Sequence, residues 1–480
     1  MTSQAAGNAI APRRHVRRRT VGYLVLTWWI ALAGSTALAG STLEQTWPDW
    51  WRAVLAAGVW GLNVLVIYYW IGGPFHVTRI PFLSALFALL MTVLGSGSYW
   101  ATTQLYPTYR VSIELAAFFV AVCTLVSLLS AGLLIRIANH SQARARSVTL
   151  AWRWETVRPL TILLFGIAAL GTVVSIKRIG YIPLLRGDPS SLRIEFPAIA
   201  GVWFRLSMLG GVVAVLLAQQ ISARKGSWRL IVPWVASLGM VSVYGPRFFF
   251  ALPAGVSLLL WDRVRGRLSV RFFSATLVLG LVLLTALYFW RQQDERAFIL
   301  GPIGLLLYAT LSEFRDLAWA LDHYSSPGRL LHGATFPSFV VPVLPAPVWN
   351  LLGVDKEAIL ARNSAAILAN EMGTDSGQRI GAFGELFMNF GWVGAMAGAA
   401  ILGLALGYLD HKSRALDRES LGHSLVTLVA AVTIFAQIGQ LNMYASAITW
   451  LGYPIGLLAI VAARRVRVVE TGVRPDRVPT

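Results

Sequence analysis

Cysteine is nearly absent from this chain of 480 residues, and charged residues are scarce. The one cysteine, Cys123, lies inside a hydrophobic run, which excludes a disulfide and a thiolate metal site and argues against a thiol nucleophile. Charged residues make up 13% of the chain and hydrophobic residues 56%, whereas soluble domains are about one-quarter charged. With a mean hydropathy of +0.62, the composition indicates that lipid is the main solvent.

Acidic residues are also few, at 22 against 41 Lys and Arg, which leaves a net charge of +19. A charge of this size is compatible with nucleic-acid binding, but the basic residues lie in short loops between apolar runs, where they orient a membrane protein. We therefore expect no nucleic-acid partner. The sequence shows no internal repeat, no low-complexity tract and no soluble domain large enough to fold independently.

Apolar runs recur along the chain, and a run of roughly 20 residues suffices to cross a bilayer. We predict about twelve spans, at 21–40, 53–71, 80–97, 111–135, 159–176, 202–221, 230–244, 247–261, 272–290, 393–409, 424–441 and 448–463. The seventh and eighth alternatively form one kinked element, because Pro246 interrupts them. A cleaved signal peptide is an alternative for the first run, although Trp28 and Trp29 and the many later spans favour a retained helix. The predicted fold is an all-α polytopic membrane protein.

The basic residues of the short loops predict the orientation. Residues rich in Arg and Lys fall on one side if the N-terminus lies inside: 1–20, 136–158, 222–229, 261–271, 410–423 and 464–480. The positive-inside bias then predicts an N-in, C-in topology with a basic cytoplasmic N-terminus and a cytoplasmic tail. Residues 21–463 form a single transmembrane domain, with long outer loops at 177–201 and 291–392.

The larger outer loop is predicted to be partly helical. Apolar residues recur there at helical spacing, at Leu311, Phe314, Leu317, Ala318 and Leu321. This stripe is suited to lying on the bilayer surface. A second amphipathic helix is expected from Asp355 to about Met372, ended by Gly373. The prolines of 337–347 predict an extended crossing between the two helices.

Arginines on the predicted outer side run against the insertion bias. Arg205 lies three residues inside an apolar run, and Arg247 lies between two such runs. Both either snorkel to the interface or bind phosphate oxygens, which a guanidinium does bidentately. In the long outer loop at 177–201, Arg186 and Arg193 flank a Gly–Asp pair and suit an anionic head group, although a solvated turn explains them equally well.

The larger loop also carries the candidate acids and bases. Glu313, Asp316 and His323 are candidate proton acceptors, or else, with Arg315, part of an ion-paired surface. His332 opens the proline-rich crossing.

The loop ends at the most informative segment of the chain, 375–394. Arg379, Glu385 and Asn389 lie there just before a span. Glu385 and Asn389 are four residues apart, so a helix would turn both toward one cavity. An acid at that depth is a functional candidate.

The run Gly-Glu-Leu-Phe-Met-Asn-Phe-Gly-Trp-Val-Gly at 384–394 resembles the penultimate-region motif of bacterial oligosaccharide repeat-unit polymerases, relatives of O-antigen polymerases and ligases. The Ile-Pro-Leu-Leu segment followed by Arg193, the Gly-Pro-Arg at 245–247 and the proline-rich 337–347 occur in the corresponding order. The resemblance covers about 180–394, and the N-terminal third matches only as hydropathy. His332 departs from the ligase motif, which disfavours the ligase members of the group.

The resemblance implies a multi-pass enzyme of the bacterial plasma (inner) membrane. Such polymerases join oligosaccharides carried on a polyprenyl diphosphate, such as undecaprenyl diphosphate, at the extracytoplasmic side, without a metal or cofactor. A chain-length regulator protein is an expected type of partner. The implied catalytic residues are Glu385, Glu313, Arg247 and Arg379, with either glutamate as the base. The implied substrate-binding residues are Arg186, Arg193, Arg205, Arg291, Arg315, Asn389 and His332.

Two other classes compete with a polymerase. A metal-dependent glycosyltransferase needs an acidic pair in the first outer loop, which offers only the non-adjacent Glu44 and Asp49. A lipid-linked-oligosaccharide flippase or transporter would often show internal repeats and midplane polar residues. Here the polar residues gather in one long loop, which favours surface chemistry.

Overall fold

The computed structural model describes the chain in segments. They are 50–70, 79–106, 111–140, 148–185, 200–222, 228–244, 247–265, 299–301, 304, 307–308, 312–341, 344, 346–373, 379–416, 420–437 and 447–467. The predicted spans at 21–40 and 272–290 lie outside the described residues.

Helices occupy the other ten predicted spans. They are α2 (Trp50–Trp70), α3 (Ile80–Leu105), α4 (Ile113–His140), α5 (Trp154–Ile179), α7 (Val202–Ser222), α8 (Ile231–Ser242), α9 (Arg247–Arg265), α17 (Gly381–Ala415), α18 (Leu421–Ala436), and a π-turn, η5 (Ile448–Gly452), that continues as α20 (Tyr453–Ala462). Five of them, α3, α4, α5, α7 and α17, are long and apolar enough to cross a membrane. The chain is thus an all-α membrane protein, in which α8 and α9 are separate helices. The count of twelve spans and the orientation remain predictions.

The helices pack around two main hydrophobic cores. One joins α2, α3, α4 and α17 with the loop helix α12 (Ser312–His323), and the other joins α5, α7, α9, α18 and α20. In the first core, glycines bring α17 against the backbone of α4. A Cβ at Gly403 would lie 2.1 Å from the Ser127 carbonyl oxygen, and one at Gly407 would lie 2.7 Å from that of Ala131. Small residues four apart allow this close approach in membrane helices.

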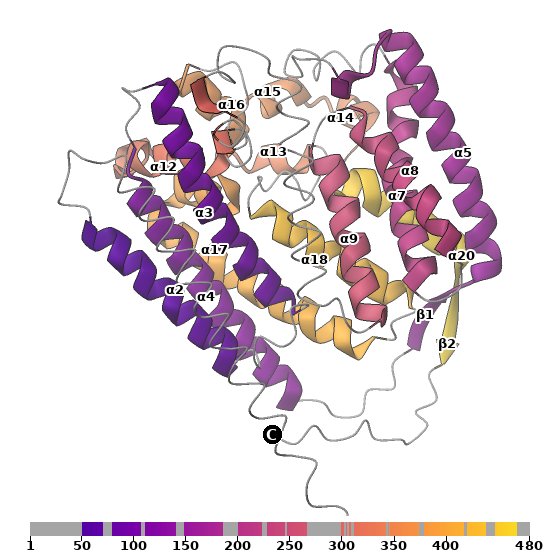
Figure 1. Cartoon of the computed structure of the whole chain (residues 1–480), viewed down its shortest axis with the longest axis horizontal. Helices are drawn as coiled ribbons and strands as arrows, with labels where there is room; N and C mark the ends of the chain where they lie inside the picture. The colour runs from indigo at the N-terminus through magenta and orange to yellow at the C-terminus, as the bar shows by residue number, and fades with distance from the viewer. Residues whose placement is uncertain are drawn as a thin grey trace, which may run out of the picture.

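A short antiparallel pair of strands joins two distant parts of the chain at one end of the bundle. Strand β1 (Val148–Trp152) follows α4 in the chain and pairs with β2 (Ala463–Arg467), which follows α20, in a register that places Trp152 opposite Ala463. Figure 1 shows this pair at the bottom and the helices of the long loop along the top. The segments around 150 and 465 therefore share one side of the molecule, as the charge pattern predicts.

The long loop is a chain of short helices. After α12 come η4 (Pro327–Arg329), α13 (Pro337–Val340), α14 (Ala346–Leu351), α15 (Lys356–Leu360) and α16 (Ser364–Glu371). Two sequence expectations were therefore wrong in part. The proline-rich crossing is not wholly extended, because α13 begins at a proline, whose fixed φ suits the first helical turn. The single helix expected after Asp355 is two helices.

Side-chain caps explain this break in the second loop helix. The Asp355 carboxylate accepts a hydrogen bond from the Ala358 N–H at 3.1 Å, as expected of a helix start. Asn363 then accepts one from the Ala366 N–H at 2.8 Å and begins α16. Gly373, with φ of 63°, follows the end of α16, as predicted.

The apolar stripe of α12 is buried inside the protein and does not lie on the bilayer surface. Phe314, Leu317 and Leu321 are at most 1% exposed and belong to the core formed with α3, α4 and α17. The contact is close, because a Cβ at Gly95 of α3 would lie 2.1 Å from the Cβ of Phe314. The helical spacing was predicted correctly, but the predicted packing partner, the bilayer surface, was wrong.

Candidate functional site

Helix α17 is broken at Gly391, six residues after Glu385. This glycine has φ of 65° and ψ of −157°, outside the helical region. A continuous helix would pair the carbonyls of Met388 and Asn389 with N–H groups four residues later. Across the break those carbonyls instead accept hydrogen bonds from the N–H groups of Leu331 at 2.9 Å and His332 at 3.0 Å. The 331–335 segment thus takes up backbone acceptors that the break exposes.

Asn389 fastens the same segment through its side chain. Its Oδ1 accepts a hydrogen bond from the Gly333 N–H at 2.9 Å, and its Nδ2 donates to Thr335 Oγ1 at 2.8 Å. The same Nδ2 also donates to the Glu385 carbonyl at 2.8 Å. Asn389 and Thr335 are both fully buried. We call the 331–335 segment and Asn389 the Asn389 clasp.

The clasp holds His332 in an unusual conformation at the surface. His332 is exposed and is the only non-glycine residue with positive φ, 47°, in the part of the chain that the structure describes. Gly333, with φ of 87°, follows it, and the ring of Phe336 packs against that of Phe390 at 5.4 Å. Left-handed backbone costs energy in a non-glycine residue and persists where surrounding contacts impose it. Here the two hydrogen bonds to Asn389 impose it.

A buried carboxylate of α12 lies beside the start of α17. Asp316 is 1% exposed, and its Oδ1 accepts hydrogen bonds from Arg315 Nη2 at 2.9 Å and Nε at 3.1 Å. Its Oδ2 accepts one from the Arg379 N–H at 3.3 Å. The Arg315 guanidinium also donates to Thr102 Oγ1 of α3 at 3.1 Å. Asp316 therefore links three segments: α12, α3 and the residue before α17.

Burial raises the pKa of Asp316 from its ordinary 3.8 to about 6. The charge and hydrogen bonds of Arg315 and the Arg379 N–H oppose this rise, while the neighbouring Glu313 adds to it. A raised pKa means that the folded protein favours the protonated carboxyl more than the unfolded chain does.

The most accessible charged pair at this end is Arg379 with Glu313. Arg379 Nη1 lies 3.8 Å from Glu313 Oε1, and the two side chains are 40% and 13% exposed. The distance is longer than a hydrogen bond, so the guanidinium keeps donors for another anion. The Arg315 side chain is only 12% exposed and already contacts Asp316, Thr102 and, at 5.9 Å, the Tyr308 ring. Arg379 is therefore more available than Arg315 to bind another anion.

A second polar cluster joins α12 to α16. The Tyr324 hydroxyl donates to Glu371 Oε2 at 2.5 Å, and His323 Nε2 lies 3.4 Å from the same oxygen. The His323 ring stacks on Trp319 at 4.4 Å. Burial, followed by the hydrogen bond to Glu371, raises the pKa of the Tyr324 hydroxyl. The cluster anchors α16 on α12 next to the site.

The structure brings together the candidates on α12 and α17 and the segment between them. Glu385 and Asn389 share a face as predicted, but both lie in packed protein, at 1% and 0% exposure, and Asn389 contacts the clasp. A nearby cavity between α3, α4, α12 and α17 is mostly apolar and is lined by residues such as Leu317, Ile380 and Phe383. Neither Glu385 nor Asn389 lines this cavity.

The other candidate residues lie apart or outside the described residues. Arg186, Arg193 and Arg291 fall outside them, and Arg247 begins α9 with a side chain that is not described. Arg205 is exposed on α7, which packs with α5, α8 and α9.

Sequence reasoning missed two partners in this site. Thr335 carries no signal of its own in the sequence. Gly391 does carry one, since a glycine two residues after Asn389 in an apolar helix suggests a break. Among the described residues, no group of three His, Cys, Asp or Glu side chains is arranged to hold a metal ion.

None of the protein-family models, curated proteins or solved structures compared with this chain matches it.

Proposed function

We propose that this protein is a membrane polymerase that joins polyprenyl-diphosphate-linked oligosaccharide repeat units into a polysaccharide on the outer face of the bacterial plasma membrane. The observation that carries the proposal is the pairing of the accessible Arg379 with Glu313 at the start of α17. A guanidinium and a carboxylate side by side suit a reaction with a diphosphate leaving group and a hydroxyl nucleophile. The resemblance of 384–394 to repeat-unit polymerases supports the same reaction.

The proposed reaction moves a glycan from one lipid carrier to another. The bond between the anomeric carbon of the donor sugar and the diphosphate oxygen breaks, and its electron pair stays on the diphosphate. The hydroxyl oxygen of the acceptor unit forms the new bond to that carbon, and its proton passes to a carboxylate. Arg379 binds the diphosphate oxygens, where negative charge increases in the transition state, and so lowers the barrier.

Of the two glutamates, Glu313 is the better candidate for the proton acceptor. Its side chain is partly exposed and lies next to Arg379. Glu385 is 1% exposed within α17, so a sugar hydroxyl does not reach it without rearrangement of the helix. We therefore assign Glu385 to the support of the site and Glu313 to the proton transfer.

Arg315 and Asn389 act as positioning residues in this proposal. Arg315 ties Asp316 to α3, and Asp316 in turn holds the backbone of Arg379. Asn389 holds His332 at the surface close to the break in α17. His332 is then available for a polar contact with the oligosaccharide.

The proposal is tested first in a strain that lacks the gene. We expect long surface polysaccharide to disappear and single lipid-linked units to accumulate on the outside of the membrane. Complementation with Arg379→Gln or Glu313→Gln should lower polymer formation by at least about 100-fold, the effect of removing one transition-state contact. Arg362→Gln, which changes an exposed arginine of the same loop, should restore normal polymer. Normal polymer length with Arg379→Gln at equal membrane abundance would contradict the proposal.

A flippase for the same lipid-linked unit is the second candidate, and the break in α17 favours it. Broken helices line substrate sites in many transporters. The deletion strain separates the two functions, because a flippase defect traps single units on the cytoplasmic side. A ligase-like transferase would instead leave a finished polymer on its lipid carrier.

A further inference from the structure

His323, at the end of α12, lies between two other segments of the long loop, and the proposed function does not use it. Its Nε2 lies 3.4 Å from Glu371 Oε2 of α16. Its Nδ1 lies 3.2 Å from Arg329 Nη1 of η4, a nitrogen that also donates to the His323 carbonyl at 3.4 Å. The ring stacks on Trp319, one turn earlier in α12. One imidazole thus joins α12 to both η4 and α16.

These two partners specify the protonation state of the imidazole. A guanidinium has donors and no acceptor, so Arg329 makes a favourable contact with Nδ1 only if Nδ1 carries a lone pair. The single proton of a neutral ring is then on Nε2, the nitrogen beside the Glu371 carboxylate. His323 in this geometry is therefore neutral, with its proton on Nε2.

Protonation of His323 would affect the two partners in opposite ways. A proton on Nδ1 removes the lone pair to which Arg329 donates and places two positive charges side by side. The same charge strengthens the attraction to Glu371, so the contact with α16 remains. One proton therefore weakens the attachment of η4 to α12 and spares that of α16.

The ionisable residues on either side of His323 have other contacts. The carboxylate of Asp322 accepts a hydrogen bond from the Ser112 N–H at 2.8 Å. The Tyr324 hydroxyl donates to Glu371, and its ring packs edge-on against the imidazole at 5.1 Å. Neither side chain takes part in the contact between the imidazole and η4.

Helices α3, α4 and α17 also pack against α12. Arg379, just before α17, lies beside Glu313 at the opposite end of α12. Glu114 of α4 and Glu385 of α17 are buried. Among the described residues, only the arginine of η4 and the glutamate of α16 bring a charge into contact with the ring.

The segment that Arg329 holds continues directly into the Asn389 clasp. None of the three residues of η4 is buried, so few other contacts fix it. Two residues after Arg329, the Leu331 N–H donates to the Met388 carbonyl beside the break in α17. A change in the position of η4 therefore acts on the entrance to the clasp.

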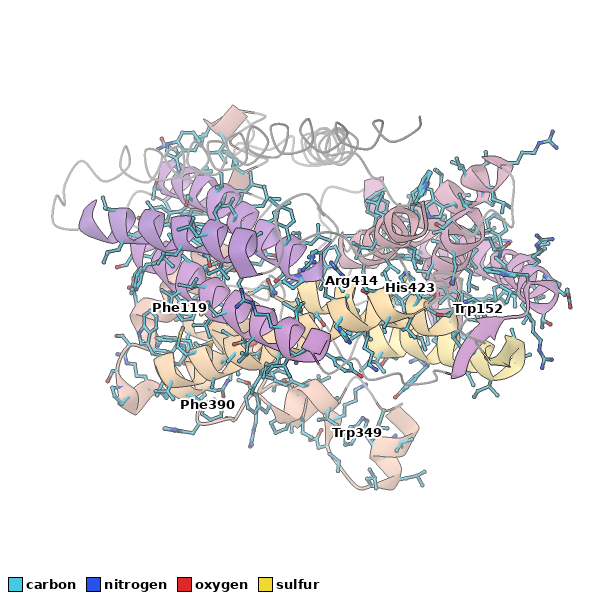
Figure 2. All side chains as sticks on the ribbon, turned by 90° about the horizontal axis from the view of Figure 1, so that it is seen from below. Phe119, Trp152, Trp349, Phe390, Arg414 and His423 are labelled. Atoms are coloured by element: carbon cyan, nitrogen blue, oxygen red, sulfur yellow. The ribbon has the colours of Figure 1, made fainter. Side chains whose placement is uncertain are left out.

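The chain beyond the clasp follows one edge of the molecule. Phe336 packs against Phe390 at 5.4 Å. In Figure 2, Phe390 and Trp349 of α14 lie toward the same edge, apart from Arg414 and His423, where α17 meets α18. Movement of this segment therefore does not require the second hydrophobic core to repack.

We propose that His323 is a proton-controlled latch for the segment that enters the Asn389 clasp. With a neutral imidazole, Nδ1 accepts from Arg329 and holds η4 against α12. With a protonated imidazole, Arg329 leaves and η4 detaches, while Glu371 keeps α16 in place. The proton comes from water and returns to water. The inference does not depend on the proposed reaction.

The test measures the mobility of η4 with a spin label on the full-length protein. Gly328→Cys adds a Cβ with no atom within 4 Å, and the native Cys123 is 0% exposed, so a nitroxide reagent labels position 328 alone. As the pH falls from about 8 to about 5, where imidazoles take up a proton, the ratio of mobile to immobile label should rise by about fivefold, the effect of losing one hydrogen bond. A label at Ala361→Cys, an exposed position of the same loop, should not respond.

Four changes in the labelled protein identify the group that titrates. His323→Gln keeps an acceptor for Arg329 and takes up no proton, so the label should stay immobile throughout. Arg329→Gln should leave the label mobile throughout. His332→Gln and Asp316→Asn remove the nearby exposed imidazole and the buried carboxyl, and each should keep the pH response.

Three results would overturn the proposal. The first is an unchanged label spectrum over the whole pH range in the protein that carries only Gly328→Cys, which needs no second variant to fold. The second is an equal pH response in His323→Gln. The third is loss of the response in His332→Gln or Asp316→Asn, which would assign it to a different group.

Discussion

The two ends of α17 are both tied to α3 through a buried aspartate, but in opposite ways. At the α12 end, Asp316 holds Arg315, whose guanidinium reaches Thr102 near the end of α3. At the other end, Asp410 accepts directly from the Ile80 N–H at the start of α3. The first aspartate belongs to a loop helix and the second to α17 itself. One connection therefore depends on a separate segment, and the other is internal to two packed helices.

The charge balance differs as well. At the α12 end, Glu313, Asp316 and Glu385 outnumber Arg315 and Arg379, so a carboxylate remains available to accept a proton. At the Asp410 end, two arginines, Arg79 and Arg414, lie near the single carboxylate of Asp410. The two ends of this pair of helices thus differ in the sign of their excess charge. Three further changes separate the two ends, from the largest expected effect to the smallest.

Removal of the Asn389 side chain should give the largest loss. Asn389→Ala deletes three hydrogen bonds of 2.8–2.9 Å, two of them buried and one partly buried, which together contribute about 3 kcal/mol at about 1 kcal/mol each. Thermal unfolding should shift to lower temperature, and polymer formation should fall, because the side-chain contacts to Gly333 and Thr335 that position the segment around His332 are lost. The backbone hydrogen bond from the His332 N–H to the Asn389 carbonyl remains. Asn350→Ala, at an exposed asparagine of α14, serves as the control, and equal stability of the two variants would contradict the role of the clasp.

An intermediate loss is expected where α17 meets α4. Gly403→Ala places a Cβ 2.1 Å from the Ser127 carbonyl oxygen, so the two helices must move apart. Overpacking of this kind costs about 2 kcal/mol. The change lies in the half of α17 that leads to Asp410, and we expect the thermal unfolding temperature to fall. Gly58→Ala in α2 adds a Cβ with no atom within 4 Å and should be neutral; a neutral Gly403→Ala would show that this contact is not close in the membrane.

The smallest expected effect is the pH dependence of the α12 end. The folded-state pKa of Asp316, about 6, lies above the ordinary 3.8. Its contribution to stability is therefore full below pH of about 4 and lost as the pH rises through about 6, with a change of about 1 kcal/mol between about pH 5 and 6.5. Thermal unfolding of wild type should fall over that range relative to Asp316→Asn. Parallel pH profiles for the two proteins would show that Asp316 does not titrate there, and Arg362→Gln should follow wild type.

The spacing of residues along the chain was enough to predict one local feature of this site. The i, i+4 spacing of Glu385 and Asn389 placed them on one face of a helix, since helical geometry depends only on neighbours in sequence. The partners of Asn389 were not predictable in this way. Gly333 and Thr335 lie 56 and 54 residues earlier in the chain, and no periodicity connects residues so distant.

Helix α12 shows the same contrast between what residue spacing predicts and what contacts between distant segments decide. Its apolar stripe follows from the spacing of Phe314, Leu317 and Leu321. A stripe of this kind fits a lipid surface and a protein groove equally well, because both bury apolar area. Only the fold provides the groove between α3, α4 and α17, in which Gly95 and Gly384 make room for Phe314 and Leu317. The surface prediction failed for this reason.

The sequence by itself determined that this chain is a helical membrane protein, because apolar runs and basic loops act through composition and need no tertiary partner. It also determined the candidate acids and arginines as residue types. Only the tertiary structure decided which of them are engaged and which are accessible. Arg315 and Arg379 look alike in the sequence, yet one contacts Asp316 and Thr102 while the other keeps 40% of its side chain exposed. Burial and pairing depend on segments brought together by folding, and these set the chemistry of a charged group.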